Sequence, residues 1–296
     1  MICVIDPNLS KNTAKQTAVR VCERLNLLGA EIRMTESLKP EFSAAENVRF
    51  LPAESVLADA DFVLAIGGDG TILRAAGWIL DHAALHGTPP VKLVGINTGT
   101  LGFLAAFESE ELNMLDRLQS GSYAISHRIM LKATICGGEQ DGFETHVLND
   151  IYASRLNGRI CDFAVSVNDI QIGVYRADGI VFSTPTGSSA YALSAGGPVM
   201  EPDLALIEMN LICPHSLFAR PMLFAPQRSI RVTYRGRGDG GLNVHADGIH
   251  AAVIHNAQSF TVTTSDRYMP FVDCKGTAFY DALNGKLMQP LKGLPE

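Results

Sequence analysis

Three glycines, a carboxylate and a hydroxyl follow one another in Gly67-Gly68-Asp69-Gly70-Thr71. Without a Cβ, a glycine can take a positive φ and let a phosphate approach its N–H group. Asp69 does not fit a simple phosphate cradle, because a carboxylate repels phosphate. It is better suited to act as a base, or to bind a hydroxyl or Mg²⁺. The alternative is an ordinary strand–helix turn in which Asp69 caps the helix.

The residues around this turn predict where it lies in a fold. Residues 61–66 form an apolar run typical of a strand buried on both faces, and residues 72–80 can continue as a helix. A second apolar strand, 91–96, ends in another polar and glycine-rich cluster, 97–104. Ligands of α/β sheets bind outside the carboxyl ends of the strands, so we expect both clusters to border one ligand site.

The first part of the chain alternates strands and helices. A strand is expected at 2–5, a helix at 11–29, a second strand at 30–34 and a short helix near 53–58. Together with the turn described above, this order predicts an α/β domain with a parallel sheet over residues 1–125.

Beyond residue 125 the pattern changes to many short strands separated by turns. This change predicts a β-rich, mostly antiparallel domain over 126–274, with a helical tail, 275–296, that packs back on the first domain. The expected strands are 127–135, 145–154, 162–167, 170–174, 179–183, 229–234, 242–246, 250–254, 259–264 and 268–272.

Three features of the second part could carry chemistry. The stretch 177–198 is rich in hydroxyls and small residues and poor in charge, which favours close contact with a polar ligand over a solvated loop. Asn149 and Asp150 fall inside an expected strand, where both types are disfavoured, so they mark either a bulge or a pair that binds ligand hydroxyls. His245, Asp247 and His250 resemble a metal site only loosely, and no cysteine completes one.

Composition narrows the classes of function. Of 296 residues, 47% are hydrophobic and 19% charged, as in soluble globular proteins. A net charge of −7 argues against non-specific binding to nucleic acid or to an anionic membrane. Six scattered cysteines and the absence of a targeting peptide indicate free thiols in the cytoplasm. The motifs of P-loop NTPases, α/β-hydrolases and zinc proteases do not occur.

Taken together, these segments resemble the NAD kinases. The Gly-Gly-Asp-Gly motif alone is weak, since phosphofructokinases and diacylglycerol or sphingosine kinases carry similar sequences. Its combination with the long hydroxyl-rich block is specific. The matching blocks are 67–71 (GGDGT), 97–104 (NTGTLGFL), 148–150 (LND), 178–179 (DG), 184–191 (TPTGSSAY), 194–198 (SAGGP), 213–216 (CPHS), 220–221 (RP) and 247–248 (DG).

The resemblance implies an enzyme that transfers the γ-phosphoryl of ATP to the 2′-hydroxyl of the adenosine ribose of NAD, giving NADP. Some members use inorganic polyphosphate as the donor. It also implies Mg²⁺ or Mn²⁺, with no metal ligand identified, and a homodimer or homotetramer. The implied architecture is an α/β domain followed by a β-rich NAD-binding domain.

Roles for individual residues follow only from this resemblance. Asp69 would deprotonate the accepting hydroxyl, and Asp178 would bind the nicotinamide end of NAD. Asp247 would lie near the phosphoryl-transfer region. The remaining candidates are Gly67, Gly68, Gly70 and Thr71 for phosphate, Asn149 and Asp150 for ribose, and Ser189, Ala190, Tyr191 and Ser194 for adenine.

Three positions depart from the usual pattern of the family: Ser189 replaces Thr, Asp150 replaces Glu, and Ile249 stands where Gln is common. Two other functions compete with NAD phosphorylation. A lipid kinase of the same superfamily would need a membrane-facing apolar or basic surface. A non-catalytic NAD(P)-binding sensor would bind without turnover, and the presence of Asp69 argues against it.

Overall fold

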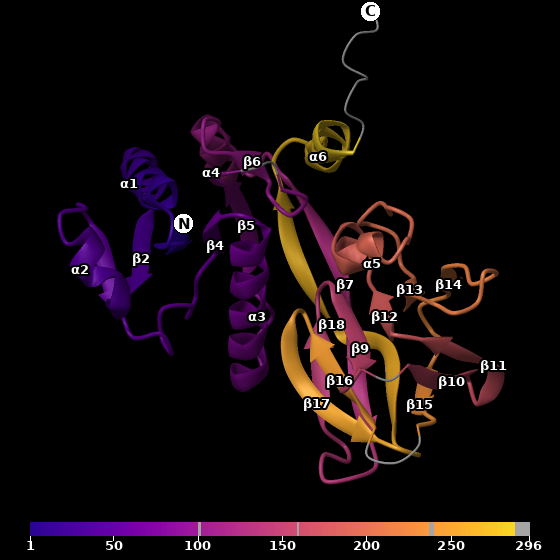
Figure 1. Cartoon of the computed structure of the whole chain (residues 1–296). Coiled ribbons are helices and arrows are strands. Elements are labelled where there is room, and N and C mark those ends of the chain that lie inside the picture. The colour runs from indigo at the N-terminus through magenta and orange to yellow at the C-terminus, as the bar shows by residue number, and fades with distance from the viewer. Residues whose placement is uncertain (100–101, 159, 237–239, 288–296) are drawn as a thin grey trace, which may run out of the picture. The chain divides into compact units, whose positions relative to one another are not determined.

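The computed structural model describes residues 1–99, 102–158, 160–236 and 240–287 (Figure 1). The chain divides into two units, one formed by residues 1–127 with the segment from Met269 onward, the other by residues 128–268. Parts of the expected cluster 97–104, of a turn at 236–240 and of the tail 275–296 lie outside the described residues.

The first unit is built on a parallel sheet in the order β3–β2–β1–β4–β5. All six positions of β4 are buried, and so are the last five of β5, because helices cover both faces of the sheet. The strands are β1 (Ile2–Pro7), β2 (Glu31–Thr35), β3 (Val48–Leu51), β4 (Phe62–Gly67) and β5 (Lys92–Asn97), with β6 (Phe107–Glu108) paired to β5.

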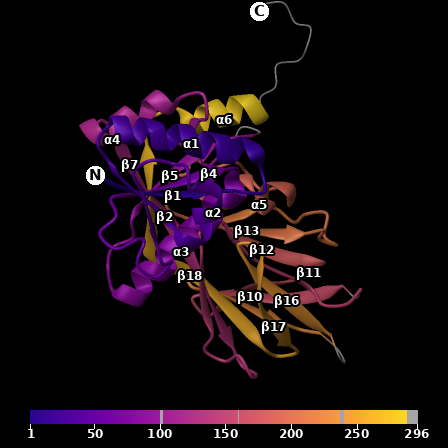
Figure 2. The same ribbon diagram turned by 90° about the vertical axis from the view of Figure 1, so that its left-hand side faces the viewer.

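Helix α1 (Asn12–Leu27) connects β1 to β2, and α3 (Asp69–His86) connects β4 to β5. The two connections run in opposite directions along the sheet. Right-handed crossovers therefore place the helices on opposite faces, as Figure 2 shows. Shorter helices complete the unit: η1 (Glu36–Leu38), α2 (Lys39–Phe42), η2 (Leu112–Met114), α4 (Leu115–Ser120) and α6 (Ala278–Lys286).

The short helix expected near 53–58 is wrong. These residues form successive turns, in which the carbonyl of Pro52 accepts hydrogen bonds from Ser55 and Val56. The next bond joins Ala58 to Ser55, and Asp59 then takes a left-handed conformation with φ of 55°. The buried neighbours Val56 and Leu57 explain the apolar pattern without a helix.

The second unit packs two antiparallel sheets around one core. In the first sheet β11, β10, β15 and β18 are neighbours, and β7 pairs with β18 and β8; the second has the order β14–β13–β12–β9–β16–β17. Phe182 and Phe260, one from each sheet, meet edge to face with 6.1 Å between ring centroids. The strands are β7 (Ala124–Cys136), β8 (Glu144–Val147), β9 (Asp150–Arg155), β10 (Cys161–Val167), β11 (Ile170–Ala177), β12 (Gly179–Ser183), β13 (Ile207–Ile212), β14 (Met222–Phe224), β15 (Ile230–Tyr234), β16 (Gly241–Ala246), β17 (Ile249–His255) and β18 (Ser259–Asp273).

Two strand predictions are wrong. The expected strand 145–154 is two strands, β8 and β9, which are separated at Leu148 and Asn149. The expected strands 259–264 and 268–272 are one, β18, which pairs with β15 near its start and, through Phe271, with Leu93 of β5 near its end. A polar segment within β18 gave the sequence the appearance of a break.

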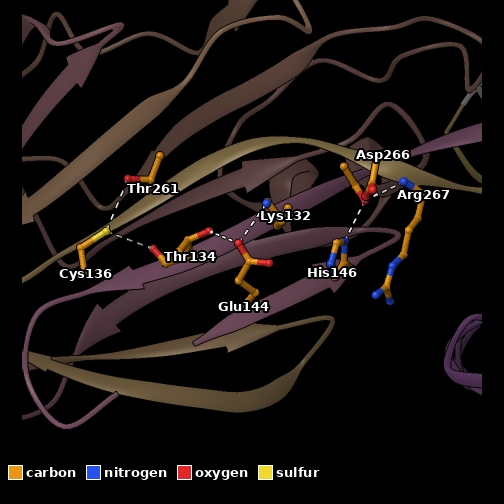
Figure 3. Close-up of polar contacts among 9 residues, drawn as sticks. Lys132, Thr134, Cys136, Glu144, His146, Thr261, Asp266 and Arg267 are labelled. Carbon is orange, nitrogen blue, oxygen red and sulfur yellow. Dashed lines mark hydrogen bonds and ion pairs between the residues drawn. The ribbon is translucent and has the colours of Figure 1, made fainter. Parts of the chain in front are cut away.

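Polar contacts join the long strand β7 to its neighbours, as Figure 3 shows. Glu144 of β8 receives hydrogen bonds from Lys132 (2.9 Å) and Thr134 (3.2 Å) of β7. His146 of β8 contacts the Ser265 hydroxyl of β18 at 2.7 Å, and that hydroxyl also accepts the N–H of Arg267 at 2.9 Å. The short strand β8 is thus held by side chains as well as by its backbone ladder.

A buried carboxyl group in β13 predicts how stability depends on pH. Glu208 is 0% exposed, its carboxyl oxygen accepts a hydrogen bond from Asn210 at 2.6 Å, and no cation is paired with it among the described residues. Burial raises the pKa of Glu208 from 4.5 to about 7. The folded protein therefore holds this proton more tightly than the unfolded chain, and stability is lost as pH rises through about 7.

We expect Glu208→Gln to be more stable than the parent by about 2 kcal/mol near pH ~8, with the difference shrinking toward pH ~5. Denaturant unfolding across this range measures the difference. Glu139→Gln, at an exposed position, is the control and should change little at any pH. A stability difference for Glu208→Gln that stays constant with pH would contradict the buried, protonated carboxyl.

Candidate active site

The Gly67–Thr71 turn is shorter than the sequence predicts. Strand β4 ends at Gly67, Gly68 is extended with φ of −98° and ψ of −176°, and α3 begins at Asp69. None of its three glycines has a positive φ, so the conformational reason expected for them is wrong. At Gly67, glycine is required for a different reason, which is space.

A Cβ on Gly67 would lie 2.3 Å from the hydroxyl oxygen of Thr71, one helical turn later. Thr71 is buried, and its hydroxyl accepts a hydrogen bond from Asn8 at 3.2 Å. By contrast, nothing lies within 4 Å of a Cβ built on Gly70. The start of α3 therefore packs directly on the end of β4, and only Gly67 makes that packing possible.

Asp69 joins the two glycine clusters. Its carboxylate accepts the N–H groups of Phe103 and Leu104, each at 3.1 Å. A Cβ on Gly102 would lie 2.2 Å from the carboxylate, so this approach also requires a glycine. The structure thus places the described part of the cluster 97–104 directly against the turn, at the carboxyl ends of β4 and β5.

The start of α3 is suited to an anion. Gly68 provides no side-chain cap, and its carbonyl already accepts the N–H of Thr71 at 2.8 Å, so the N–H groups of Asp69 and Gly70 are the ones left for a ligand. The Asp69 side chain is 37% exposed, and the Nζ of Lys286 lies 3.7 Å from it. Two amide donors and one ammonium hold the carboxylate in place while leaving it accessible to a substrate hydroxyl.

In the second unit, Asp247 organises the predicted ribose-binding residues. It lies in the tight turn between β16 and β17, with φ of 47°, and its carboxylate accepts the N–H groups of Leu148 (2.8 Å), Asn149 (2.8 Å) and Asp150 (3.1 Å). These three bonds replace ladder bonds and explain why the expected strand breaks there. Asp247 is therefore a residue that positions its neighbours.

Asn149 and Asp150 both present unusual polar atoms. The Asn149 side-chain oxygen is buried and has no hydrogen-bond partner among the described residues, which a ligand hydroxyl would correct. Burial, and next the charge of Asp247, raise the pKa of Asp150 to about 7, although the N–H of Tyr191 donates a hydrogen bond to it. Near neutral pH this carboxyl group can therefore both donate and accept a hydrogen bond.

The hydroxyl-rich block folds against this pair. Thr184 donates to the carbonyl of Leu148 at 2.6 Å and accepts the N–H of Gly187 at 3.0 Å. A Cβ on Gly187 would lie 2.2 Å from the Asn149 carbonyl oxygen, which explains that glycine. The rest of the block forms η3 (Thr186–Ser189), then Ala190, then α5 (Tyr191–Ser194), so the four predicted adenine contacts are consecutive or one turn apart.

Aromatic rings adjoin the block. Tyr191 is 37% exposed and meets Tyr152 edge-on at 4.9 Å, and Tyr152 stacks on His245 at 4.6 Å with the ring planes 9° apart. No motif in the sequence predicts this stack. The available signal was the strand alternation, which puts Tyr152 on the same face of β9 as Asp150.

Asp178 lies apart from the other candidates of its unit. It pairs with Arg155 at 2.9 Å, next to Gly179, which lies opposite Ser154 in the sheet. Asp150 is at the other end of β9 from Arg155, the partner of Asp178. The two ends are five residues apart, or about 16 Å at ~3.3 Å per residue. The structure brings together Asn149, Asp150, Tyr191 and Asp247 but not Asp178.

Family models match both parts of the chain. The ATP-NAD kinase N-terminal domain matches residues 2–123, and the ATP-NAD kinase C-terminal domain matches residues 148–274. Within the described residues, no helix is long and apolar enough to span a membrane.

Relatives and solved structures agree with these matches. The NAD kinase of Caldanaerobacter subterraneus subsp. tengcongensis is 32% identical over 285 residues, which are 96% of this chain and 97% of that protein. The NAD kinase of Thiobacillus denitrificans is 35% identical over 77% of each chain. Yeast NADH kinase complexed with NADH has a TM-score of 0.86 at 22% identity, over 100% of this chain and 89% of that one. An Archaeoglobus fulgidus NAD kinase in complex with ATP has a TM-score of 0.69 at 25% identity, over 96% and 98%.

The α/β unit with its Gly-Gly-Asp-Gly turn and the β-rich unit with its Asn-Asp pair are those of a phosphotransferase that acts on a nucleotide. The chain belongs to the NAD kinase family. It phosphorylates NAD, as the resemblance of its sequence blocks implied.

The packing at the turn predicts opposite effects for two glycine substitutions. Gly67→Ala should destabilise the protein by about 1–3 kcal/mol, because its methyl group overlaps Thr71. Gly70→Ala has space and lies inside a helix, so it should be neutral or stabilise by up to about 1 kcal/mol. Denaturant unfolding of both variants is the measurement. Equal effects at the two positions would contradict the role assigned to space.

The carboxyl pair predicts the pH dependence of NAD binding. If ionised Asp150 accepts ribose hydroxyls, NAD affinity should rise with pH through about 7, the raised pKa of that group. Asp247→Asn removes the charge that contributes to this raised pKa, so the midpoint should move to lower pH. Calorimetric titration with NAD at several pH values measures the shift.

The control is Asp169→Asn, which changes a hairpin-turn aspartate that is 82% exposed and paired with Arg231. It should leave the midpoint unchanged. A midpoint that does not move in Asp247→Asn would remove the coupling between Asp150 and Asp247.

Proposed function

We propose that the protein places ATP at the Gly67–Thr71 turn and the adenosine ribose of NAD at Asn149 and Asp150, with Asp69 as the group that receives the 2′-hydroxyl proton. The observation that carries this proposal is the fixed carboxylate of Asp69 at the start of α3, held by the amides of Phe103 and Leu104. The ATP complex of the Archaeoglobus fulgidus relative and the NADH complex of yeast NADH kinase agree with these substrates.

The transfer joins the 2′-oxygen of NAD to the γ-phosphorus of ATP and breaks the bond from that phosphorus to the bridging oxygen of ADP. The proton of the 2′-hydroxyl passes to Asp69. Such reactions have a loose transition state, so the protein contributes positioning and neutralisation of charge rather than covalent chemistry. The start of α3, with the N–H of Gly70, would supply fixed positive charge for the phosphates, whereas the N–H of Thr71 is already bonded to the Gly68 carbonyl at 2.8 Å.

A divalent ion, Mg²⁺ or Mn²⁺, would neutralise the triphosphate when bound. No group of three or more His, Cys, Asp or Glu side chains that could hold a metal occurs among the described residues. That fits an ion carried mainly by substrate phosphates, which needs only one or two protein carboxylates. At the turn, the exposed carboxylate of Asp69 is the donor that fits this role.

On the NAD side, the unpartnered oxygen of Asn149 and the carboxyl of Asp150 would accept or donate to ribose hydroxyls. Ser189, Ala190, Tyr191 and Ser194 would surround the adenine, with the exposed ring of Tyr191 offering a stacking surface. Asp247 would act by fixing the backbone of 148–150, and Asp178 would bind the nicotinamide end of the extended dinucleotide.

We also propose that the enzyme is a cytoplasmic homo-oligomer that binds neither nucleic acid nor membranes. All six cysteines are free thiols, which supports a cytoplasmic location. The net charge of −7 supports a protein that binds neither nucleic acid nor membranes. A homodimer or homotetramer is supported by β11, which ends its sheet and exposes Ile170, Ile172 and Val174 along one edge.

A coupled assay tests the reaction directly. Incubation with NAD, ATP and Mg²⁺, followed by an NADP-specific dehydrogenase, should give a signal that requires all three. Replacing ATP by polyphosphate then defines the donor. NAD binding without any signal would favour the sensor, and neither binding nor signal would direct attention to lipid substrates.

Asp69→Asn should lower kcat at least about 1000-fold while NAD binding stays near that of the parent, because the amide cannot take the proton. Asp81→Asn, an exposed change on the same helix, is the matched control and should keep its activity. Near-normal turnover of Asp69→Asn would remove Asp69 from the mechanism.

A further inference from the structure

The C-terminal helix delivers a lysine to the catalytic turn. Lys286 is the last residue of α6, and its Nζ lies 3.7 Å from the Asp69 carboxylate and 4.8 Å from the ring centroid of Phe103. Phe103 in turn contacts Phe279 of the same helix, with 6.2 Å between centroids. Phe103 therefore has two roles. Its N–H donates to the Asp69 carboxylate, and its ring holds α6 and Lys286 beside that carboxylate.

A second lysine approaches the turn from the start of the chain. The Nζ of Lys11 would lie 3.9 Å from a Cβ built on Gly68 and 3.6 Å from one built on Gly99. The loop that carries it is tied to the turn, because Asn8 donates its side-chain N–H to Thr71 at 3.2 Å. Across the described ranges, no carboxylate lies within ion-pair distance of Lys11.

Two further cations of this unit are already paired with carboxylates. Arg74 of α3 binds both oxygens of Asp6 at 3.1 and 3.0 Å, and Lys275 binds Glu111. A triphosphate brings several negative charges to a turn whose own charged side chain, Asp69, is also negative. The chain has no P-loop lysine to offset them. Cations must therefore reach the turn from other segments, and Lys11 and Lys286 do so.

We infer that Lys11 and Lys286 bind the phosphates of the donor from two sides of the Gly67–Thr71 turn. In the free protein Lys286 neutralises Asp69. When the donor binds, a phosphate oxygen replaces Asp69 as its partner, and the carboxylate becomes available to the ribose hydroxyl. The inference rests on the proposed placement of the donor at this turn and adds the two residues that make an anion acceptable there.

The test is a binding and kinetic comparison on the full chain. Lys286→Met and Lys11→Met keep side-chain length and remove the charge. Each should raise the KM for ATP and the calorimetric Kd for inorganic tripolyphosphate about 10- to 100-fold, the effect of one charge-assisted hydrogen bond. The KM for NAD should change less than about 3-fold. Lys286→Arg should recover most of the ATP affinity, because the charge is restored.

The matched control is Lys92→Met. Lys92 makes the same type of contact, with its Nζ 4.9 Å from the ring centroid of Phe62, but it lies at the start of β5, at the opposite end of the sheet from the turn. This variant should bind tripolyphosphate like the parent. Circular dichroism of each variant separates loss of a ligand from loss of folding.

A double substitution separates a phosphate contact from an effect through Asp69. In an Asp69→Asn background, Lys286→Met should still weaken tripolyphosphate binding about 10-fold or more. A loss that disappears in this background would overturn the inference and leave Lys286 as a counterion of Asp69 only. If Lys11→Met and Lys286→Met bind and turn over ATP as Lys92→Met does, the lysines are not ligands, while the proposed function stands. If instead the parent protein neither binds tripolyphosphate nor turns over ATP, the proposed placement of the donor at the turn fails as well.

Discussion

The first unit depends on one interaction: the carboxylate of Asp69 accepts the N–H groups of Phe103 and Leu104. Through it, the start of α3 and the segment that follows β5 become a single rigid surface. The contact works only because Gly102 leaves room for the carboxylate and Gly67 leaves room for Thr71. The first requirement that the Gly-Gly-Asp-Gly motif meets is therefore close packing of α3 on the end of β4. Its openness to phosphate follows from the uncapped helix start that this packing leaves.

In the second unit, too, a carboxylate accepts backbone N–H groups from a distant segment. Asp247, in a tight turn, accepts three consecutive N–H groups from residues 148–150 and interrupts the strand there. In both units a carboxylate accepts backbone N–H groups from another segment, and in the second unit two of the residues it holds, Asn149 and Asp150, are those proposed to bind the ribose. The environments differ in exposure. Asp69 remains accessible, whereas Asp150 is buried beside Asp247, and this raises the pKa of Asp150 to about 7.

The alternation of strands and helices, and the break to short strands after residue 125, predicted the fold because each follows from a local apolar pattern. The sequence also located the turn and the Asn-Asp pair. It could not predict what depends on distant partners. Asp247 breaks a strand almost 100 residues away in the sequence. None of Gly67, Gly68 and Gly70 takes the expected positive φ, and Gly67 is required instead by its contact with the Thr71 side chain. Lys11 and Lys286 lie about 60 and 217 residues from Asp69 in the sequence, so no motif could connect them to it.

Those long separations have an electrostatic reason. A P-loop places its lysine within the loop, so a single segment binds phosphate. Here the charged residue of the turn is Asp69, which we propose receives the proton of the acceptor hydroxyl. A carboxylate and a triphosphate can share a site only if positive charge surrounds both. The chain meets this condition by bringing a loop from its beginning and a helix from its end to the same turn. The return of α6 to the first unit, fixed by Phe279 on Phe103, is thus explained by the charge of the site as much as by burial of its apolar face.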